Sequence, residues 1–452
     1  MPIIVFSNRG LFHQHIMPIE ELNFPAGTRL LGRWQANDAQ ATARLKEIFD
    51  ATIEGQYDEI FRDPAPQDAV HVAGPVDLMT LTIMHRLYGL TAAEYYKQEP
   101  ERFVRTSLMT QKLLGMPKLY ISWPVYGFTA EALGQEMIYS DQYSPGTDPD
   151  KPLANADNWQ DIATPAMDAG IPKLLDEVSA CYKRLTGLDP VLHLTAAYSL
   201  AADIFGQEQI ITALTHEPEF VNKFLDHLAD TVLQPWMEHF FRQYPNGWVE
   251  LSDASGSPFF IGPQNCKNMA IRSTQRLIAR NPWGNRVYDA NYRGDYVTRA
   301  NKRNPTSSRR RSAVKSDAAQ LGLEELFEIK NSVCPEFVIR LAEDRTPVSF
   351  YLEQAIRCNI PLFMGVGATL IDRNSIADLE IAKQDIEAMT VEYVEAIRTV
   401  ARTIAGNGYD SRALPWPGTV YFEDISAESN YELIEIIVAT TLEKGALGIA
   451  AT

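Results

Sequence analysis

Short apolar runs alternate with amphipathic segments along most of this chain. The runs that we interpret as buried strands end in Gly, Pro, Ser or Asp, and they span residues 69–73, 118–122, 191–195, 248–251, 286–290, 337–341 and 361–365. Between them, residues 215–245 carry apolar side chains at helical spacing, with Thr215 as the expected N-cap and Pro218 in the first turn. A second long helical tract, 375–406, closes on Gly406. Repeated strand and helix units predict parallel strands with right-handed crossovers, and seven or eight of them predict an α/β fold of the (β/α)₈ TIM-barrel type.

Two segments depart from this pattern. Residues 1–66 contain Pro and Gly around one charged helical stretch, 38–55, and we expect an N-terminal extension packed on a barrel formed by residues 67–452. Residues 293–320 are basic in a chain that is otherwise acidic. That segment is either a solvated loop and helix face or a docking surface for an acidic partner.

Composition narrows the class of protein. The 452 residues are 45% hydrophobic and 22% charged, as in soluble globular proteins, and the net charge of −17 argues against a nucleic-acid or membrane-surface binder. No apolar run reaches the length of roughly 20 residues that a membrane span needs, and the first apolar run is too short for a signal peptide, so we expect a cytoplasmic protein. The four cysteines lie far apart without CxxC spacing, which disfavours a disulfide framework and a cysteine-rich zinc site.

The polar residues that end the apolar runs are the candidate site, because a parallel barrel places its site at the carboxyl ends of its strands. They form an acidic and aromatic set. The candidate catalytic residues are Asp253, Asp289 and Glu343, and the candidate substrate-binding residues are Tyr120, Trp123, His193, Tyr198, Glu250, Asn291, Tyr292 and Met364. Asp253 and Asp289 end adjacent strands, and if they approach each other one pKa should rise to a value suited to a general acid.

Each candidate also has a structural interpretation. Asp253 and Asp289 can be helix caps or loop acceptors, His193 can be a satisfied core histidine, and the aromatic residues can be core packing. The chain has no GxGxxG after a strand, no GxxxxGK[ST], no GxSxG and no HExxH, so the nucleotide, hydrolase-elbow and zincin classes lack their motifs. All eight histidines lie at or before His239, so the later strands must act without histidine.

Four stretches carry a resemblance to a known superfamily: "VHVAGPVDLMTLTIMHRLYGLTAAEYY", "KLLGMPKLYISWPVYGFTAEALGQEMIYSDQYSP", "AAYSLAADIFGQEQIITALTHEPEFVNKFLDHL" and "VELSDASGSPFFIGPQNC". In this order they resemble the uroporphyrinogen decarboxylase superfamily, and more closely its corrinoid-dependent methyltransferase branch, over roughly residues 67–450. The resemblance implies a (β/α)₈ barrel whose cup holds a small methylated substrate. It also implies a separate corrinoid protein whose cobalt exchanges the methyl group, because no cobalamin-binding DxHxxG pattern occurs in this chain.

Two departures from the superfamily refine what the resemblance implies. The chain has no N-terminal arginine-rich "MRQAGR" motif, so porphyrinogen decarboxylation is not expected. Asp289 and Asn291 replace the His-x-Cys of the zinc-dependent thiol methyltransferases, and no later cysteine stands near residues 367–369, so that zinc site is not expected either. We therefore expect no metal site of this type, while a carboxylate-rich one stays open.

The resemblance then points to the component that removes a methyl group from a small, for example methoxyaromatic, substrate and passes it to the corrinoid partner. Such a component needs a proton donor for the leaving group, and Asp253, Asp289 or Glu343 would supply the proton. Two alternatives stay open: a non-porphyrin decarboxylase or other lyase, and a non-catalytic ligand-binding barrel. The sequence does not decide between a monomer and a homodimer.

Overall fold

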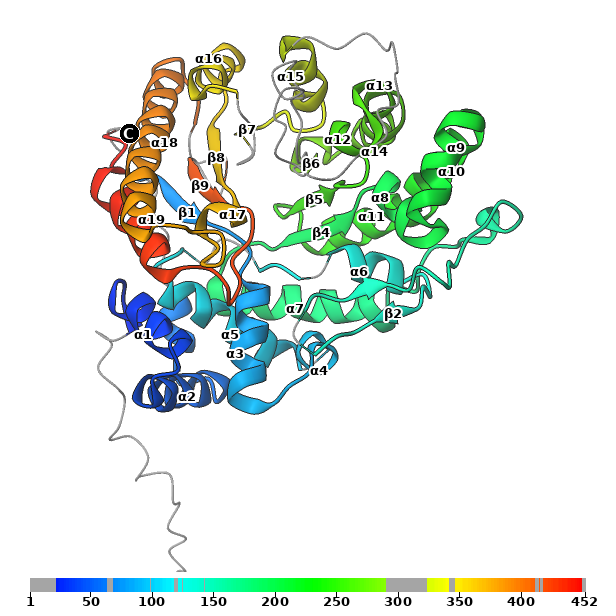
Figure 1. Cartoon of the computed structure of the whole chain (residues 1–452). Helices are drawn as coiled ribbons and strands as arrows, with labels where there is room; N and C mark the ends of the chain where they lie inside the picture. Colours follow the sequence, from blue (N-terminus) through cyan, green and yellow to red (C-terminus); the bar gives the residue numbers. More distant parts are fainter. Residues whose placement is uncertain are drawn as a thin grey trace, which may run out of the picture.

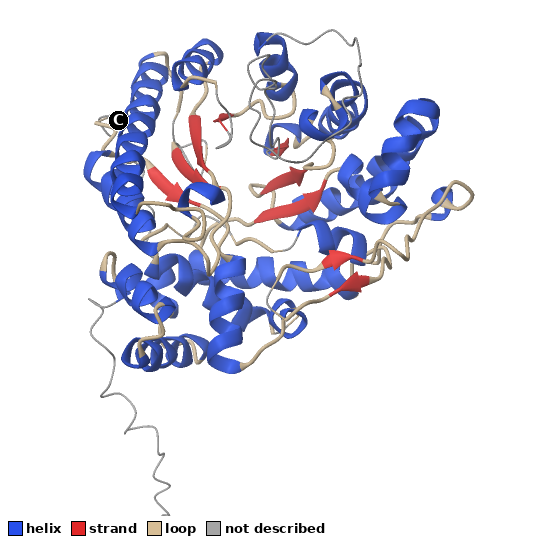
Figure 2. Ribbon diagram, in the orientation of Figure 1, coloured by secondary structure: helices blue, strands red, loops and turns tan. Residues whose placement is uncertain are grey.

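The computed structural model describes residues 22–62, 68–97, 99–117, 121–123, 125–141, 143–289, 323–340, 346–410, 414 and 418–448. Its parallel strands lie at the centre and its helices around them (Figures 1 and 2). One sheet has the order β1 (His71–Ala73), β9 (Thr419–Phe422), β8 (Leu362–Val366), β7 (Val338–Arg340), and the other has the order β4 (Val191–Thr195), β5 (Trp248–Ser252), β6 (Val287–Asp289). Every neighbouring pair in these two sheets is parallel. The predicted α/β class with parallel strands is confirmed, while closure into one barrel stays a prediction.

The predicted strands agree closely with the observed ones. β4 has the predicted bounds, and β1, β5, β6, β7 and β8 lie within two residues of theirs. Of the run 118–122, residues 118–120 lie outside the described residues, and 121–122 are not in a strand. β9 was missed because "TVYF" is a run of only four residues behind a Pro- and Gly-rich stretch.

Helices cover the outer side of both sheets. α16 packs on β7, α18 on β8 and β9, α19 on β1, and α6 and α7 on β4. The helices are α1 (Ala26–Gln35), α2 (Ala39–Ile53), α3 (Asp77–Tyr88), α4 (Ala92–Tyr96), α5 (Pro100–Leu113), α6 (Val125–Glu131), α7 (Gly170–Thr186), α8 (Ala197–Phe205), α9 (Gln207–His216), α10 (Pro218–Leu228), α11 (Gln234–Gln243), α12 (Pro258–Ile261), α13 (Pro263–Asn265), α14 (Arg272–Arg280), α15 (Leu323–Asn331), α16 (Val348–Cys358), α17 (Ala368–Ile371), α18 (Leu379–Gly406) and α19 (Tyr431–Lys444). Shorter elements are the 3₁₀ turns η2 (Asp58–Arg62), η3 (Trp159–Asp161) and η6 (Gly284–Arg286), the π-helical turns η4 (Ala229–Leu233) and η5 (Cys266–Ile271), and the antiparallel pair β2 (Met137–Ile138) and β3 (Gly146–Thr147). None of the described helices combines the length and apolar character needed to cross a membrane.

The two long helical tracts were predicted with different success. α18 ends at Gly406 as expected. The Thr215 cap was wrong: α9 continues through Thr215 to His216, and Glu217 is the N-cap of α10. The break falls one residue before Pro218 because the residue that precedes a proline is disfavoured in the helical conformation.

The N-terminal helices pack against the rest of the chain. α1 contacts α5 and α19, and Arg29 of α1 forms an ion pair with Glu435 of α19. The predicted charged helix is present as α2, where the Asp38 side chain accepts hydrogen bonds from the backbone N–H groups of Gln40 and Ala41. The expected boundary near residue 66 lies outside the described residues and stays a prediction.

The side chains of the strands form two separate packed layers. Val191, Trp248 and Tyr288 from one sheet share a small apolar cluster with Phe363 of the other sheet and with Phe337, the residue before β7. The rings of Tyr288 and Phe337 are 4.9 Å apart, so the two sheets face a common interior. We call this side of the strands the inner face. Alternate residues, among them Val249, Leu251, Val287 and Met364, pack in the large core instead, and we call theirs the helix-facing side.

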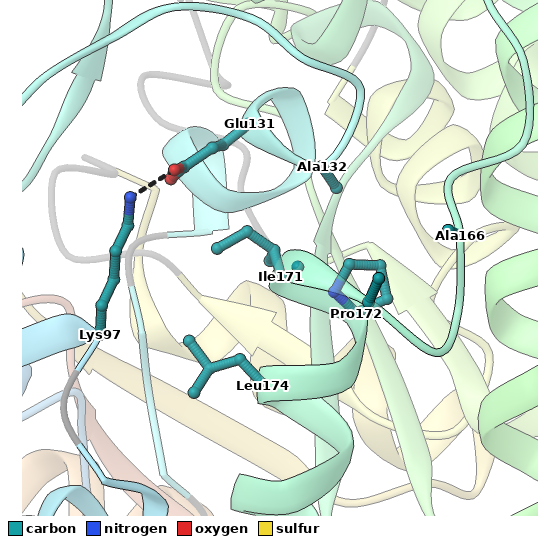
Figure 3. A pocket seen from close by; sticks show the side chains of 9 residues that line it. Lys97, Glu131, Ala132, Ala166, Ile171, Pro172 and Leu174 are labelled. Carbon is teal, nitrogen blue, oxygen red and sulfur yellow. Dashed lines mark hydrogen bonds and ion pairs between the residues drawn. The ribbon is translucent and has the colours of Figure 1, made fainter.

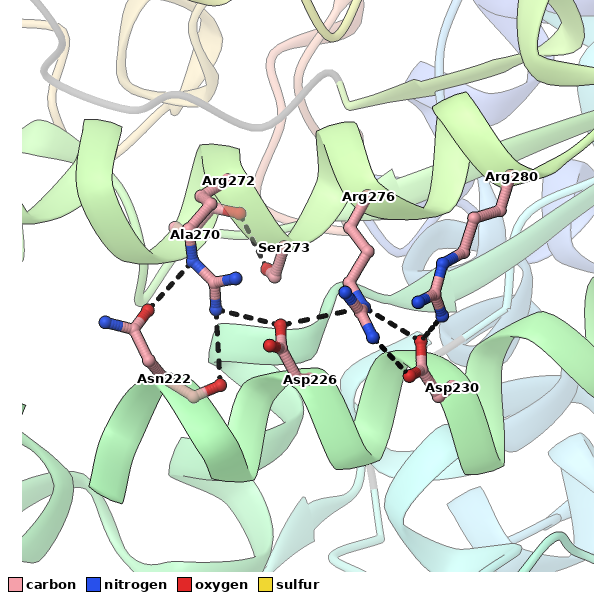
Figure 4. Close-up of polar contacts among 8 residues, drawn as sticks. All are labelled: Asn222, Asp226, Asp230, Ala270, Arg272, Ser273, Arg276 and Arg280. Carbon is pink, nitrogen blue, oxygen red and sulfur yellow. Dashed lines mark hydrogen bonds and ion pairs between the residues drawn. The ribbon is translucent and has the colours of Figure 1, made fainter. Parts of the chain in front are cut away.

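A ladder of charged side chains joins two of the outer helices (Figure 4). Its arginines lie four residues apart on α14, and its acceptors lie four residues apart on α10 and η4: Arg272, Arg276 and Arg280 face Asn222, Asp226 and Asp230. Arg276 is 2.6 Å from Asp230 and 3.8 Å from Asp226, so it bridges two carboxylates. The equal spacing brings the charges into register and fixes how α14 lies on α10.

Candidate functional site

Three neighbouring strands bring polar side chains together on the inner face. His193 pairs in register with Glu250, and Glu250 pairs with Tyr288, so the three side chains point to the same side. The Nδ1 atom of His193 is 3.6 Å from Oε1 of Glu250. The hydroxyl of Tyr288 donates a hydrogen bond of 2.8 Å to Oε2 of the same carboxylate. Glu250 therefore has partners on both oxygens.

This arrangement favours an ionised Glu250 inside the protein. Burial by itself raises the pKa of a carboxyl group. Here the charge and hydrogen bond of His193, with hydrogen bonds from Tyr288 and Ser252, outweigh burial and hold the pKa of Glu250 below its ordinary value. The polar partners of Glu250 therefore compensate for the cost of burying its carboxylate.

A second acid, Asp77, follows β1 at the start of α3. Its Oδ2 accepts a hydrogen bond from the Tyr96 hydroxyl and its Oδ1 accepts one from Ser122, both at 2.9 Å. Burial raises the pKa of Asp77, and these hydrogen bonds and the charge of His193 offset the rise only in part. Because His193 acts on both Asp77 and Glu250, the two acids belong to one electrostatic group.

Trp123 covers His193 from the side. Its indole N–H donates a 3.3 Å hydrogen bond to the backbone carbonyl of His193, and the two rings meet edge to face at 5.4 Å. We call the whole group the inner polar cluster, which consists of Asp77, Tyr96, Ser122, Trp123, His193, Glu250 and Tyr288. It combines a buried acid, an imidazole–carboxylate pair and aromatic surface on the inner face of the parallel strands, with His193, Glu250 and Tyr288 at the middle of β4, β5 and β6.

The structure places Asp253 against α8. Its Oδ1 accepts hydrogen bonds from the backbone N–H and the hydroxyl of Ser199, at 3.1 and 2.7 Å, and from the N–H of Gly256 at 3.1 Å. Burial nevertheless raises the pKa of Asp253 to about 6, because these hydrogen bonds only partly compensate for it. The carboxyl therefore titrates near neutrality, as expected of a general acid, but it also has the structural role of a cap, which was the alternative interpretation.

Asp289 lies on the helix-facing side of β6. It shares that side with Val287, whereas Tyr288 points to the inner face with Glu250. The backbone N–H of Asp289 donates a hydrogen bond of 2.9 Å to the carbonyl of Val333, so Asp289 lies beside Cys334, whose pKa is raised by burial and further by the charge of Asp289. The proposed contact between Asp253 and Asp289, and the catalytic role of either, stay predictions.

Of the remaining candidate residues, some are buried in the core and the others lie outside the described part of the chain. Tyr198 in the first turn of α8 and Met364 of β8 are fully buried in the large core. Tyr120, Asn291, Tyr292 and Glu343 lie outside the described residues, as does the basic segment 293–320. Substrate binding by each of them stays a prediction.

The candidate site residues named from the sequence leave out four members of the inner polar cluster: Asp77, Tyr96, Ser122 and Tyr288. A signal for Tyr288 was present, because it alternates with Asp289 along the strand and one of the two must face inward. A signal for Asp77 was also present, since "AGPVD" follows the first apolar run. Tyr96 ends α4 and comes close to Asp77 only through the tertiary fold.

A surface pocket of about 520 Å³ lies at the start of α7 (Figure 3). Its lining is mostly small and apolar, with the Lys97–Glu131 ion pair on one side: Lys97, Glu131, Ala132, Ala166, Ala169, Gly170, Ile171, Pro172 and Leu174. None of these residues belongs to the inner polar cluster, so the pocket is a separate feature. Over the described part of the chain, no three His, Cys, Asp or Glu side chains come together as metal ligands.

No protein-family model matches the chain, and no curated protein does either. Among solved structures it is similar to a methyltransferase from Methanosarcina mazei, with a TM-score of 0.56 and 14% sequence identity over 88% of this chain and 98% of that chain. This likeness shows that the two chains share a fold over nearly their whole lengths.

Proposed function

We propose that this chain is a methyltransferase, and specifically the component of a corrinoid-dependent demethylation system that binds the methylated substrate. It would pass a methyl group from a small, for example methoxyaromatic, compound to the cobalt of a separate corrinoid protein. The inner polar cluster is the observation on which this proposal rests, and the fold shared with a methyltransferase agrees with it. On this proposal the two sheets are parts of one (β/α)₈ barrel, because their inner faces share one cluster of aromatic side chains.

The chemistry requires an acid in the protein. Methyl transfer from an ether oxygen leaves an alkoxide or phenoxide, which departs poorly unless it is protonated. Asp77 fits this role better than Asp253, because it faces the inner polar cluster while the Asp253 carboxyl caps α8. Burial raises the pKa of Asp77, so this acid holds its proton to higher pH than an ordinary aspartic acid.

The neighbours of Asp77 would position the substrate and keep the acid in place. Tyr96 and Ser122 fix its two oxygens. The His193–Glu250 pair supplies a second polar contact for the substrate, and Trp123 supplies an aromatic edge for a flat ring. The corrinoid would be brought by the partner and would supply the nucleophile that accepts the methyl group.

The partner would dock over the carboxyl ends of the strands. Two short helices there expose large apolar side chains: Phe260 on α12, which follows β5, is 50% exposed, and Leu370 on α17, which follows β8, is 42% exposed. Exposed apolar residues at the mouth of a site are typical of an interaction surface. We expect Phe260→Ala to weaken binding of the corrinoid protein, and Leu442→Ala on α19 is the matched control because Leu442 is 60% exposed away from the strand ends.

The direct test mixes the protein with a reduced corrinoid protein and a panel of methoxylated and other methylated compounds. Formation of methyl-cobalt, followed by its absorbance, is the expected result. Asp77→Asn should lower the rate by about 10²- to 10⁴-fold, the usual contribution of a general acid, while the exposed Asp385→Asn should not change it. Absence of methyl-cobalt across a broad panel would refute the proposal.

A lyase is the second candidate, because the same cluster can act without a corrinoid. Asp77 or His193 could protonate the carbanion that a decarboxylation leaves behind. Carbon dioxide release from a small carboxylic acid in the absence of any corrinoid would favour this alternative. Methyl transfer without carbon dioxide release would exclude it.

A further inference from the structure

The surface pocket at the start of α7 has a charged wall and an apolar wall (Figure 3). The Lys97–Glu131 ion pair forms the charged wall. Ile171, Pro172 and Leu174 form most of the apolar wall, and Ile171 is buried against the large core. The volume of about 520 Å³ lies within the range of roughly 300–1,000 Å³ that is typical of small-molecule sites. The pocket is therefore large enough to hold a whole small ligand.

Both carboxylate oxygens of Glu131 already have a donor. Oε1 accepts a hydrogen bond from the Lys97 ammonium, and Oε2 accepts one from the Tyr139 hydroxyl, both at 2.5 Å. Glu131 is also the less exposed member of the ion pair, with a side-chain exposure of 21% against 40% for Lys97. A ligand in the pocket therefore meets a carboxylate whose charge is compensated.

Lys97 still has hydrogen-bond donors for a ligand. An ammonium group carries three N–H donors. In the described part of the chain, Lys97 donates one hydrogen bond, to Glu131, while its Nζ lies 4.5 Å from the centre of the Tyr139 ring. Glu131 and Tyr139 thus hold the ammonium group at the pocket wall, and its other N–H donors can bind a negatively charged group there.

The backbone at the start of α7 favours the same sign of ligand charge. α7 begins at Gly170 without a side-chain cap and without an acidic residue in its first turn. The first N–H groups of a helix carry partial positive charge, and this effect adds to that of Lys97. The polar side of the pocket is therefore suited to an anion.

The apolar side of the pocket requires a ligand with an apolar body. Ala132, Ala166 and Ala169 complete this side with short side chains, which leave room for such a body. Ala166, Ala169 and Gly170 are exposed, so a ligand can enter from solvent. Burial of apolar surface contributes about 25 cal/mol per Å², which an inorganic anion would not gain.

We propose that this pocket is a second binding site of the protein, and that it takes a small monocarboxylate with an apolar body, such as an aromatic acid. The carboxylate binds Lys97, and the apolar body packs on Ile171, Pro172 and Leu174. The proposal does not depend on the methyltransferase activity, because the pocket shares no residue with the inner polar cluster.

The experiment titrates benzoate into the full chain and follows binding by calorimetry. Wild type should bind benzoate saturably. Benzyl alcohol keeps the aromatic ring but has no charge, so it should bind about tenfold more weakly or worse. Lys97→Met should weaken benzoate binding by about tenfold or more for the same reason.

Two further variants separate the role of Lys97 from a general effect of charge. Lys173→Met is the matched control, because Lys173 lies on α7 beside the pocket but does not line it and pairs with Glu177 at 3.7 Å. It should bind benzoate as wild type does. Glu131→Gln removes the negative charge of the wall while Lys97 remains, so it should bind benzoate at least as tightly as wild type.

A variant that fills the pocket provides a second measurement. Ala132→Phe keeps Lys97 and should exclude benzoate, and its circular dichroism and urea denaturation show that it is folded. Absence of saturable benzoate binding by wild type, or equal affinity in wild type and Lys97→Met, would overturn the proposal. Binding that is lost in Glu250→Gln and kept in Lys97→Met would place benzoate in the inner polar cluster and would also overturn it.

Discussion

Gly256 should tolerate no side chain, because the Asp253 carboxylate occupies the space beside it. A Cβ at position 256 would lie 2.5 Å from Oδ2 and 2.6 Å from Oδ1 of Asp253, distances that Cβ atoms in proteins essentially never show. Asp253 cannot move away freely, since Oδ1 also holds Ser199 and the N–H of Gly256 itself. Gly256→Ala must therefore either strain the loop or break the hydrogen bonds that fasten it to α8.

The expected loss of stability follows from these two costs. Overpacking a buried site costs about 1–3 kcal/mol, and a lost hydrogen bond to a charged group costs about 1.5–3 kcal/mol. Alanine also lowers the conformational entropy of the unfolded chain, which stabilises the folded variant by about 0.4–1 kcal/mol. We therefore expect Gly256→Ala to lower the free energy of unfolding by about 2–4 kcal/mol.

Urea denaturation of wild type, Gly256→Ala and the control Gly146→Ala measures this loss. Gly146 lies on β3, where an added Cβ would meet no atom of the described residues within 4 Å, so its substitution should change stability by no more than about 0.5 kcal/mol. In an Asp253→Ala background the collision partner is gone, and Gly256→Ala should then cost much less. The reasoning is refuted if Gly256→Ala is as stable as Gly146→Ala, or if its cost is undiminished without Asp253.

Two further predictions concern charge. The pKa of Glu250 lies below its ordinary value, so its pairing stabilises the fold above about pH 4.3 and this contribution is lost as the pH falls through the folded pKa. When denaturation is measured at neutral and at acid pH, the free energy of unfolding should therefore fall less on acidification for Glu250→Gln than for wild type. An equal fall in both proteins would contradict the prediction. Arg276→Ala in the ladder should cost about 1 kcal/mol at low ionic strength and less in high salt, because Arg276 bridges Asp226 and Asp230. Arg62→Ala is the control: its ion pair is 3.7 Å long and exposed, so no measurable loss is expected.

The sequence predicted most strands because their apolar runs are buried on both sides. The run 191–195 is buried at every position, and such a run has few alternatives to a central strand. β9 was missed for a physical reason as well: with four residues it has too little periodicity of its own, and its place is fixed by pairing with β1 and β8. Helix ends were predicted where a local signal determines them, as at Gly406, and missed at Thr215 because the chain remained helical up to the break before Pro218.

The candidate site was harder to predict than the fold, since a site depends on which side of a strand each residue faces. A shift of one residue exchanges the two sides. "VYD" in β6 shows the consequence. The sequence favours Asp289 as the site residue, but Tyr288, one residue earlier, is the side chain that hydrogen-bonds to Glu250. On β5, Glu250 and Ser252 share one face, as the alternation of side chains along a strand requires, and the Ser252 side chain donates a hydrogen bond to the Glu250 carboxylate.

Glu250 on β5 and Asp253 directly after β5 are kept in the protein by different interactions. Glu250 is kept ionised by His193 and Tyr288, which are its direct neighbours in register. Asp253 follows β5 directly and lies against α8, where its Oδ1 accepts hydrogen bonds from Ser199 and from the backbone N–H of Gly256 and has no cation beside it among the described residues. The first carboxylate is suited to orient a polar substrate and the second to fasten a loop. A substitution that removes the charge of Glu250 should therefore alter substrate binding, whereas a substitution that removes the carboxyl group of Asp253 should alter mainly the pH dependence of stability.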